Sequence, residues 1–362
     1  MEPSLSIAAR TALASGVVTL GMAGLTVAFH GGMRWRARQL EEQIQELAGQ
    51  FALYLTGAVA TARLREFSTA VPGEAFWGAL QRFGDNIGGD EWSWLSRQLG
   101  ALRHLRDERG RLERGPAWRR EMAARRLGMI DDPDAREALN AALDHATPEV
   151  RLRALLSLAR LQDRPGLEWL LAHPQALEGV APSVALAVLK RFGSDFKVEM
   201  RALLTGPRLT GRLVVAAAEV LGVWRDVEAR PSLERLLQAG DLEERVAAAR
   251  ALGNLGASES SAMLAAALSD TAWQVRAQAA RSLGRLSDAD AVPRLAQATS
   301  DMAWWVRRNA SYSLAALGTP GVAALHRIAA AHRDRYASEM AVEALQALEW
   351  ELDSPGGIGR VG

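Results

Sequence analysis

The sequence contains no cysteine, which excludes disulfide bonds, thiol catalysis and cysteine-ligated zinc. Its six histidines include no HExxH pair, so no helical zinc site is predicted. A glycine-rich phosphate loop ending in Lys-Ser or Lys-Thr, a GxSxG nucleophile turn and a dinucleotide-binding fingerprint are missing as well. We therefore expect a protein that is not an enzyme and that needs no metal or cofactor.

The chain also lacks an excess of charge of either sign. Lysine and arginine number 43 against 42 acidic residues, which gives a net charge of +1. This balance argues against nucleic-acid binding through bulk charge. Lysine occurs only at Lys190 and Lys197, so nearly all positive charge is arginine, a bias typical of a GC-rich bacterial genome. Phosphate-backbone binding by an arginine-lined surface stays open as an alternative, and a steep loss of binding with added salt would support it.

Charged residues are absent from the 19 positions between Thr11 and Phe29. A helix of this length nearly spans a hydrocarbon core, so residues 1–33 are predicted to form a transmembrane anchor. Arg34, Arg36 and Arg38 follow, and the positive-inside rule then places the N-terminus outside and the rest of the chain in the cytoplasm of a bacterium. A cleaved signal peptide is the alternative, although the flanking charge lies on the wrong side and no small-x-small cleavage site lies near Phe29 and His30.

Small residues recur along one face of this predicted membrane helix. Such faces allow close packing against a second transmembrane helix, and a weakly hydrophobic anchor rich in alanine and glycine is the alternative. The residues concerned are Thr11, Ser15, Gly16, Thr19, Ala23 and Gly24.

Residues 34–115 are predicted to form a helical juxtamembrane connector. Apolar residues step by three or four through 35–67, which predicts one amphipathic helix, and turn residues then separate short helices at 76–83 and 91–109. The arginine-rich stretch 103–126 is expected on a solvated helix face, with anionic lipid as the alternative contact. The aromatic residues are expected to pack inside the protein, with a seat at the bilayer interface as the alternative: Phe76, Trp77, Phe83, Trp92 and Trp94.

An internal repeat fills residues 116–350, before a flexible tail at 351–362. A column of alanines recurs every 31 residues, with a single interval of 32, and a leucine follows each alanine by four positions. The i, i+4 spacing places each pair on one face of a helix. The columns are Ala123, Ala154, Ala185, Ala217, Ala248, Ala279, Ala310 and Ala341, and Leu127, Leu158, Leu189, Leu221, Leu252, Leu283, Leu314 and Leu345.

A second helix is predicted in each repeat. Pro231 and Pro293 stand at equivalent early positions, where a helix tolerates proline, and a further column runs through Leu236, Ala267, Ala298 and Ala329. Two helices in about 31 residues cannot bury both apolar faces alone, so neighbouring repeats must stack. The sequence thus predicts an all-α fold, an α-solenoid of about eight helix pairs.

Segments such as SDTAWQVRAQAARSLGRLSDADAVPRLAQATSD resemble the short HEAT-like repeats of phycobilisome lyases. The Val-Arg pair of that family stands here at Val150-Arg151, Val275-Arg276 and Val306-Arg307, while Pro182, Val214 and Ser338 break the column. The resemblance implies that the arginine pairs with an aspartate between repeats, here Asp270 or Asp301. Because the family shares an architecture and not one activity, it implies scaffolding, chromophore-lyase or nucleic-acid-binding roles.

Tryptophans gather near the start of the first helices. Trp273 and Trp304 share one repeat position, and Trp118 and Trp305 share the next. Tryptophan and arginine are enriched at protein-binding hot spots. We therefore expect a protein partner to dock on this edge, with coverage of inter-repeat seams as the alternative. The expected docking residues are Trp273, Trp304, Trp305, Arg276, Arg307 and Arg308.

Together these features predict a membrane-anchored scaffold or regulatory subunit of an inner-membrane complex, whose partner could be a membrane enzyme of the glycosyltransferase type. The alternatives are a lyase-like protein that delivers a chromophore or modifies its partner, and a nucleic-acid-binding repeat protein.

Overall fold

The computed structural model describes residues 3–84, 89–100, 102–206, 211–331 and 334–353. Across this part of the chain every regular element is a helix, which confirms the predicted all-α class. The chain divides into two compact units, Met1–Ser157 and Leu158–Gly362, called here the N-terminal and C-terminal units.

The N-terminal unit opens with the long helix α1 (Pro3–Leu55), followed by α2 (Thr61–Ala70), α3 (Gly73–Gly84), α4 (Gly89–Leu99) and α5 (Arg103–Arg114). The continuous helix predicted over 35–67 breaks after Leu55, because Gly57 adopts a positive φ of 76°. The single helix predicted at 91–109 is likewise two, α4 and α5. Repeat helices α6 (Ala117–Leu127), α7 (Pro133–His145) and α8 (Pro148–Arg160) follow.

Within the described part of the chain, no helix is both long enough and apolar enough to cross a membrane. This finding overturns the predicted inner-membrane anchor and its orientation. The uncharged stretch 11–29 is rich in alanine, glycine and threonine, which supply little apolar surface. The small-residue face predicted for membrane packing falls on residues whose side chains lie outside the described part: Thr11, Ser15, Gly16, Thr19, Ala23 and Gly24.

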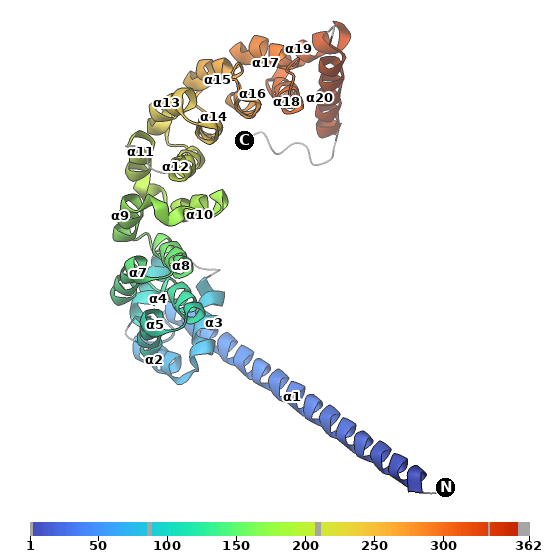
Figure 1. Ribbon diagram of the computed structural model, residues 1–362. Helices are drawn as coiled ribbons and strands as arrows, with labels where there is room; N and C mark the ends of the chain where they lie inside the picture. The colour runs from blue at the N-terminus through green and yellow to red at the C-terminus, as the bar shows by residue number, and fades with distance from the viewer. Residues whose placement is uncertain (1–2, 85–88, 101, 207–210, 332–333, 354–362) are drawn as a thin grey trace. The chain divides into compact units, whose positions relative to one another are not determined.

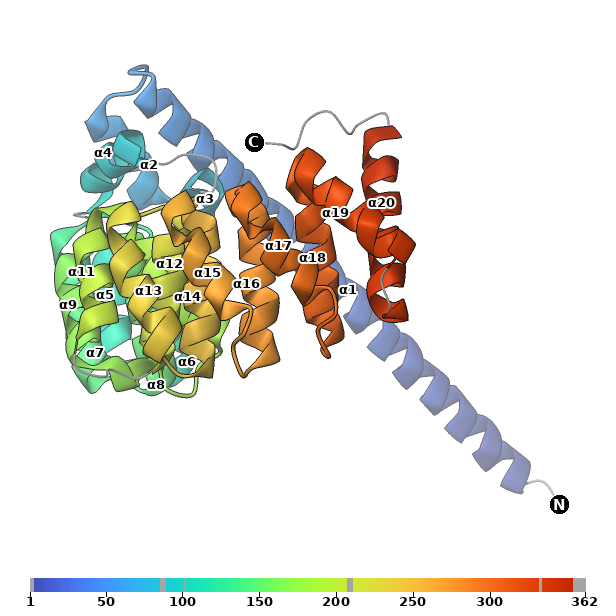
Figure 2. The same cartoon turned by 90° about the horizontal axis from the view of Figure 1, so that it is seen from above.

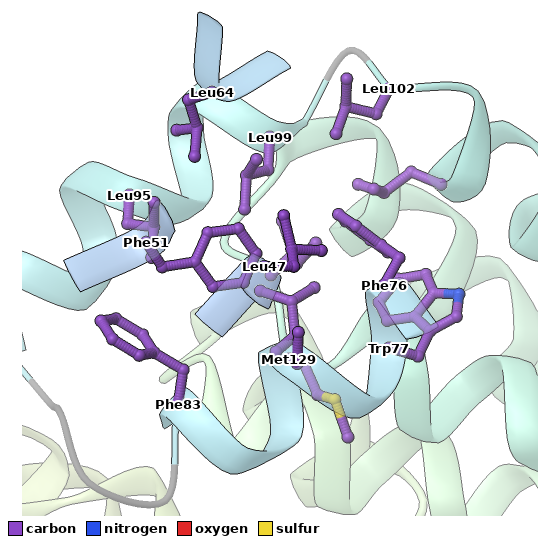
Figure 3. Close-up of a cluster of buried hydrophobic side chains, with 14 of the residues drawn as sticks. Leu47, Phe51, Leu64, Phe76, Trp77, Phe83, Leu95, Leu99, Leu102 and Met129 are labelled. Atoms are coloured by element: carbon purple, nitrogen blue, oxygen red, sulfur yellow. The ribbon is translucent and has the colours of Figure 1, made fainter. Parts of the chain in front are cut away.

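An aromatic and aliphatic cluster forms the core of the N-terminal unit (Figure 3). Phe51 of α1 and Phe76 of α3 are fully buried, and Trp77 and Phe83 are nearly so. The aromatic residues of α3 therefore pack inside the protein, as predicted. Trp94 is 41% exposed, although its ring stacks on Tyr54 at 4.5 Å between centroids.

The C-terminal unit stacks helices in chain order (Figure 1). The even-numbered helices lie on the inner side of its bend, and the odd-numbered helices cover their outer side. In the view from above, successive helices lie side by side (Figure 2). The inner layer contains α10 (Pro182–Phe192), α12 (Gly211–Val223), α14 (Leu242–Leu255), α16 (Trp273–Leu286), α18 (Trp304–Ala316) and α20 (Arg335–Asp353). The outer layer contains α9 (Arg164–Ala172), α11 (Lys197–Thr205), α13 (Arg230–Ala239), α15 (Ser261–Ala267), α17 (Val292–Ala298) and α19 (Gly318–Ala331).

The repeat columns form the core between these layers. Every alanine of the predicted column is fully buried, and so is every leucine before Leu345, which is half-buried in the last helix. In the column predicted for the second helices, Ala298 is buried, whereas Leu236, Ala267 and Ala329 are half-buried. Leu233, Leu264 and Leu295 of the same helices are fully buried.

Small residues allow successive inner helices to approach closely. A Cβ added at Gly284 would lie 2.5 Å from Oγ of Ser313 on the next helix, and that hydroxyl donates to the carbonyl oxygen of Ala280 at 2.8 Å. Gly253 and Ser282 repeat the same contact one unit earlier. The glycine that follows the column leucine in these two repeats thus allows close packing of neighbouring helices.

Candidate functional site

The three predicted docking tryptophans lie at the start of α16 and α18 and are partly open to solvent. Trp273 is 41% exposed, Trp304 is 44% and Trp305 is 52%. The rings of Trp304 and Trp305 meet edge to face at 4.7 Å between centroids. Their exposure makes them available for contact.

Two of the predicted docking arginines serve the fold. Arg276 forms a bidentate pair with Asp301, with Nε donating to Oδ2 at 2.7 Å and Nη2 to Oδ1 at 2.9 Å. The same pairing joins Arg245 to Asp270, which confirms the inter-repeat aspartates. Arg307 donates to the backbone carbonyl oxygen of Asp301 at 2.9 Å.

These pairs affect protonation. The hydrogen bond to Asp301 raises the pKa of Arg276. Burial acts to raise the pKa of the Asp301 carboxyl, but hydrogen bonds from Arg276 and from the backbone N–H of Ala303 outweigh burial and lower it. Arg276 therefore stays protonated in an ion pair within the protein, and little of its side chain is exposed for contact with a partner.

A groove of about 450 Å³ opens on the exposed side of α16 and α18. Two predicted docking residues, Trp305 and Arg308, line it, whereas Trp273, Arg276 and Arg307 do not. Trp304 stands beside the groove, with the guanidinium of Arg308 5.9 Å from its ring centroid. The other charged, polar or aromatic residues along its wall are Arg281, Arg285, Asn309, Tyr312 and Ser313.

Contacts fix the position of the groove residues. Arg308 lies over the ring of Tyr312 at 4.5 Å, and the Tyr312 hydroxyl donates to Oε1 of Glu343 at 3.1 Å. Arg285 donates to the side-chain oxygen of Asn254. Arg281 makes no hydrogen bond or ion pair with any residue that the structure describes.

Sequence reasoning missed Arg281, Arg285, Asn309 and Tyr312. A signal existed in the 31-residue register, because the position two residues after each of the last five column alanines is polar: Glu219, Arg250, Arg281, Tyr312 and Glu343. In the structure Arg250 pairs with Glu219 and Tyr312 bonds Glu343. The register thus forms a row of side chains along the inner helices, with Arg281 at its centre.

The N-terminal unit has a larger groove, of about 690 Å³, between α5 and α7. Its charges are mixed, since Arg109 pairs with Asp134 and Arg114 lies 3.4 Å from Glu113. Nearby, Arg111 and Arg126 both bind the buried carboxylate of Glu108, at 2.6 Å and 2.7 Å. Much of the arginine-rich stretch is therefore neutralised by its own neighbours.

Among the described residues, no cluster of three or more histidine, aspartate or glutamate side chains could hold a metal ion.

Comparison with known families places HEAT repeats in both units. The HEAT repeats model matches residues 260–346, and the PBS lyase HEAT-like repeat model matches residues 119–145 and 244–270. This chain therefore contains HEAT repeats, including repeats of the PBS lyase HEAT-like type. Among curated proteins no relative matches at a significant level.

Several solved structures are similar in part. Human deoxyhypusine hydroxylase is 22% identical, with 86% of this chain and 98% of that chain covered and a TM-score of 0.29. The CpcE and CpcF complex of phycocyanin lyase from Nostoc is 21% identical, with 67% and 87% covered and a TM-score of 0.29. The karyopherin Kap121p, bound to the C-terminus of the phosphatase Cdc14p, is 13% identical, with 82% and 39% covered and a TM-score of 0.44. This chain thus spans well under half the length of that karyopherin.

Proposed function

We propose that this chain is a protein-binding scaffold or regulatory subunit, and that the groove on α16 and α18 is part of its docking surface. The observation that carries the proposal is the exposure of Trp305 beside Arg308 on two adjacent repeat helices. Tryptophan and arginine dominate binding energy at protein interfaces. That the chain is not an enzyme is part of the same proposal.

The repeat architecture supports this role. Stacked repeats hold side chains of successive helices at fixed intervals along an extended surface, which suits recognition of another protein. Because the seam between α16 and α18 is closely packed at Gly284 and Ser313, the groove walls need little ordering when a partner binds. Pre-organisation of this kind favours affinity.

Affinity purification with mass spectrometry tests the proposal. The full chain is compared with the double variant Trp305→Ala, Arg308→Ala and with the control Arg294→Ala, an exposed arginine on the outer helix α17. We expect at least one protein to be captured by the full chain and the control and lost from the double variant, with helical circular dichroism unchanged in all three. Equal capture by all three chains would refute the proposed docking surface.

A further inference from the structure

The groove gathers arginines that have no acidic partner among the residues that the structure describes. Arg281, Arg285 and Arg308 all line it, and the groove wall includes no carboxylate. Elsewhere in the C-terminal unit comparable arginines have acidic partners, as Arg245 has Asp270 and Arg250 has Glu219. Three adjacent guanidinium groups without such partners make a site for an external anion.

The electrostatics of Arg285 support this view. Partial burial, together with the positive charges of Arg281 and Arg250, lowers its pKa below the usual value for arginine. The group stays protonated at neutral pH, because the ordinary arginine pKa lies far above 7. The folded chain therefore carries repulsion among these arginines, which an anionic ligand would relieve.

Carboxylates limit the positive region along the row of inner side chains. On one side Glu219 neutralises Arg250, and on the other Glu343 accepts a hydrogen bond from Tyr312. A long phosphate backbone running along this row, from one inner helix to the next, would meet both glutamates, and the chain as a whole has a net charge of only +1. The arrangement favours a short anionic segment that crosses α16 and α18.

Aromatic groups supply apolar contact at the same place. Trp305 exposes 52% of its surface, and Tyr312 is half-buried beside Arg308. A ligand that placed carboxylates on the arginines would have an aromatic surface within reach of a neighbouring side chain. Inorganic anions lack such a side chain, whereas an acidic peptide has one; against a nucleic acid, whose bases could also stack, stand the carboxylates of Glu219 and Glu343.

We infer that the groove on α16 and α18 binds a short acidic segment of a partner protein, with carboxylates on Arg281, Arg285 and Arg308 and an apolar side chain against Trp305. This inference rests on the proposed function and specifies the chemistry of the partner. Carboxylates can accept paired hydrogen bonds from the planar guanidinium groups, which lysine could not offer.

Fluorescence anisotropy with labelled peptides tests the inference on the full chain. The probe is a short peptide of alternating glutamate and phenylalanine, and the matched probe replaces every glutamate by glutamine. We expect the acidic probe to bind about tenfold more tightly than the glutamine probe, and its affinity to fall as salt screens the arginines. Equal affinity of the two probes would overturn the inference.

Protein variants locate the binding site. The double variant Arg281→Gln, Arg285→Gln should weaken binding of the acidic probe about tenfold, while Arg294→Gln on α17 should leave it unchanged. The charge-conserving variant Arg281→Lys, Arg285→Lys should retain part of the affinity, because it keeps the charge but loses paired hydrogen bonds. Unchanged binding by the glutamine variant would overturn the inference.

A third probe separates peptide from nucleic acid. A labelled single-stranded oligonucleotide should bind more weakly than the acidic peptide, and tighter binding of the oligonucleotide to the groove would overturn the inference. The proposed function can survive such a result, because capture of a protein that depends on Trp305 and Arg308 is measured independently. Conversely, the acidic probe can bind the arginines when no protein is captured, and the two failures are therefore distinguishable.

Discussion

The arginines on the two sides of helices α16 and α18 differ in their pairing with carboxylates. Toward the turns between repeats, Arg276 is only 17% exposed and forms a bidentate pair with Asp301. Along the exposed groove of the same helices, Arg281 has no acidic partner among the described residues and Arg285 contacts only the amide oxygen of Asn254. The residue type is shared, but its electrostatic surroundings differ.

This difference separates residues that maintain the stack from residues offered to a ligand. Removing a paired, partly buried charge leaves its partner uncompensated and costs stability. Removing an unpaired, exposed charge costs the fold little and can relieve repulsion. Stability and binding should therefore respond to different substitutions on the same two helices.

The largest expected effect is on the paired side. Asp301→Ala leaves Arg276 without its carboxylate and should lower the free energy of unfolding by about 3 kcal/mol. Urea denaturation followed by circular dichroism measures the loss. The control Asp290→Ala removes an exposed carboxylate of the neighbouring turn and should change stability by less than about 0.5 kcal/mol. An equal loss of unfolding free energy in the two variants would contradict the claim that the paired carboxylate stabilises the fold more than the exposed one.

Gly284→Ala tests the packing beneath the groove. The new methyl group would lie 2.5 Å from Oγ of Ser313, so α16 and α18 must separate, and we expect a loss of about 2 kcal/mol despite the better helix propensity of alanine. At Gly110 in α5 a Cβ meets nothing within 4 Å. Gly110→Ala should therefore stabilise its helix by up to about 1 kcal/mol, and a destabilisation there would contradict the packing argument.

A smaller effect is expected from pH. Since the pKa of Asp301 is lowered in the folded state, the unfolded chain takes up the proton first as pH falls. The stabilisation by Asp301 should be complete above about pH 4, the ordinary pKa of aspartate, and should decrease as pH falls through the folded pKa. Denaturation of the native chain and of Asp301→Asn at several pH values should show their difference shrinking in acid. A constant difference would contradict a role for the ionised carboxylate.

The smallest effect on stability is expected in the groove. Arg281→Gln combined with Arg285→Gln should change the free energy of unfolding by less than about 0.5 kcal/mol, because neither side chain has an ion-pair partner among the residues that the structure describes. Thermal melting of this variant beside the native chain measures the change. A loss comparable with that of Asp301→Ala would show that these arginines also maintain the stack.

The repeat core could be predicted from the sequence because it obeys one periodicity. The alanine and leucine columns follow from helix geometry repeated at 31 residues, and the inter-repeat aspartates were implied by the resemblance to HEAT-like repeats. The second-helix column marks the core less completely, since Ala298 is buried while Leu236, Ala267 and Ala329 are half-buried. The prediction of a membrane anchor was wrong because it relied on the absence of charge. Apolar surface is the stronger signal for a membrane helix, and alanine, glycine and threonine supply little of it.

The candidate site was predicted only in part. Trp305 and Arg308 stood out as residue types enriched at interfaces, and both line the groove. Arg276 and Arg307 are of a residue type equally enriched at interfaces, but both donate hydrogen bonds to Asp301 within the repeat array. Composition does not reveal which arginines are already paired, because pairing depends on the side-chain geometry of neighbouring repeats.

Site-specific photo-crosslinking in cells tests the central claim most directly. A benzoylphenylalanine placed at the position of Trp305 should crosslink to a partner protein, and the crosslink should disappear when Arg281→Gln and Arg285→Gln are added. The same group at the position of Arg294, on the outer helix α17, should give no such product. Crosslinking of equal strength from both positions, or none from the position of Trp305, would contradict the account.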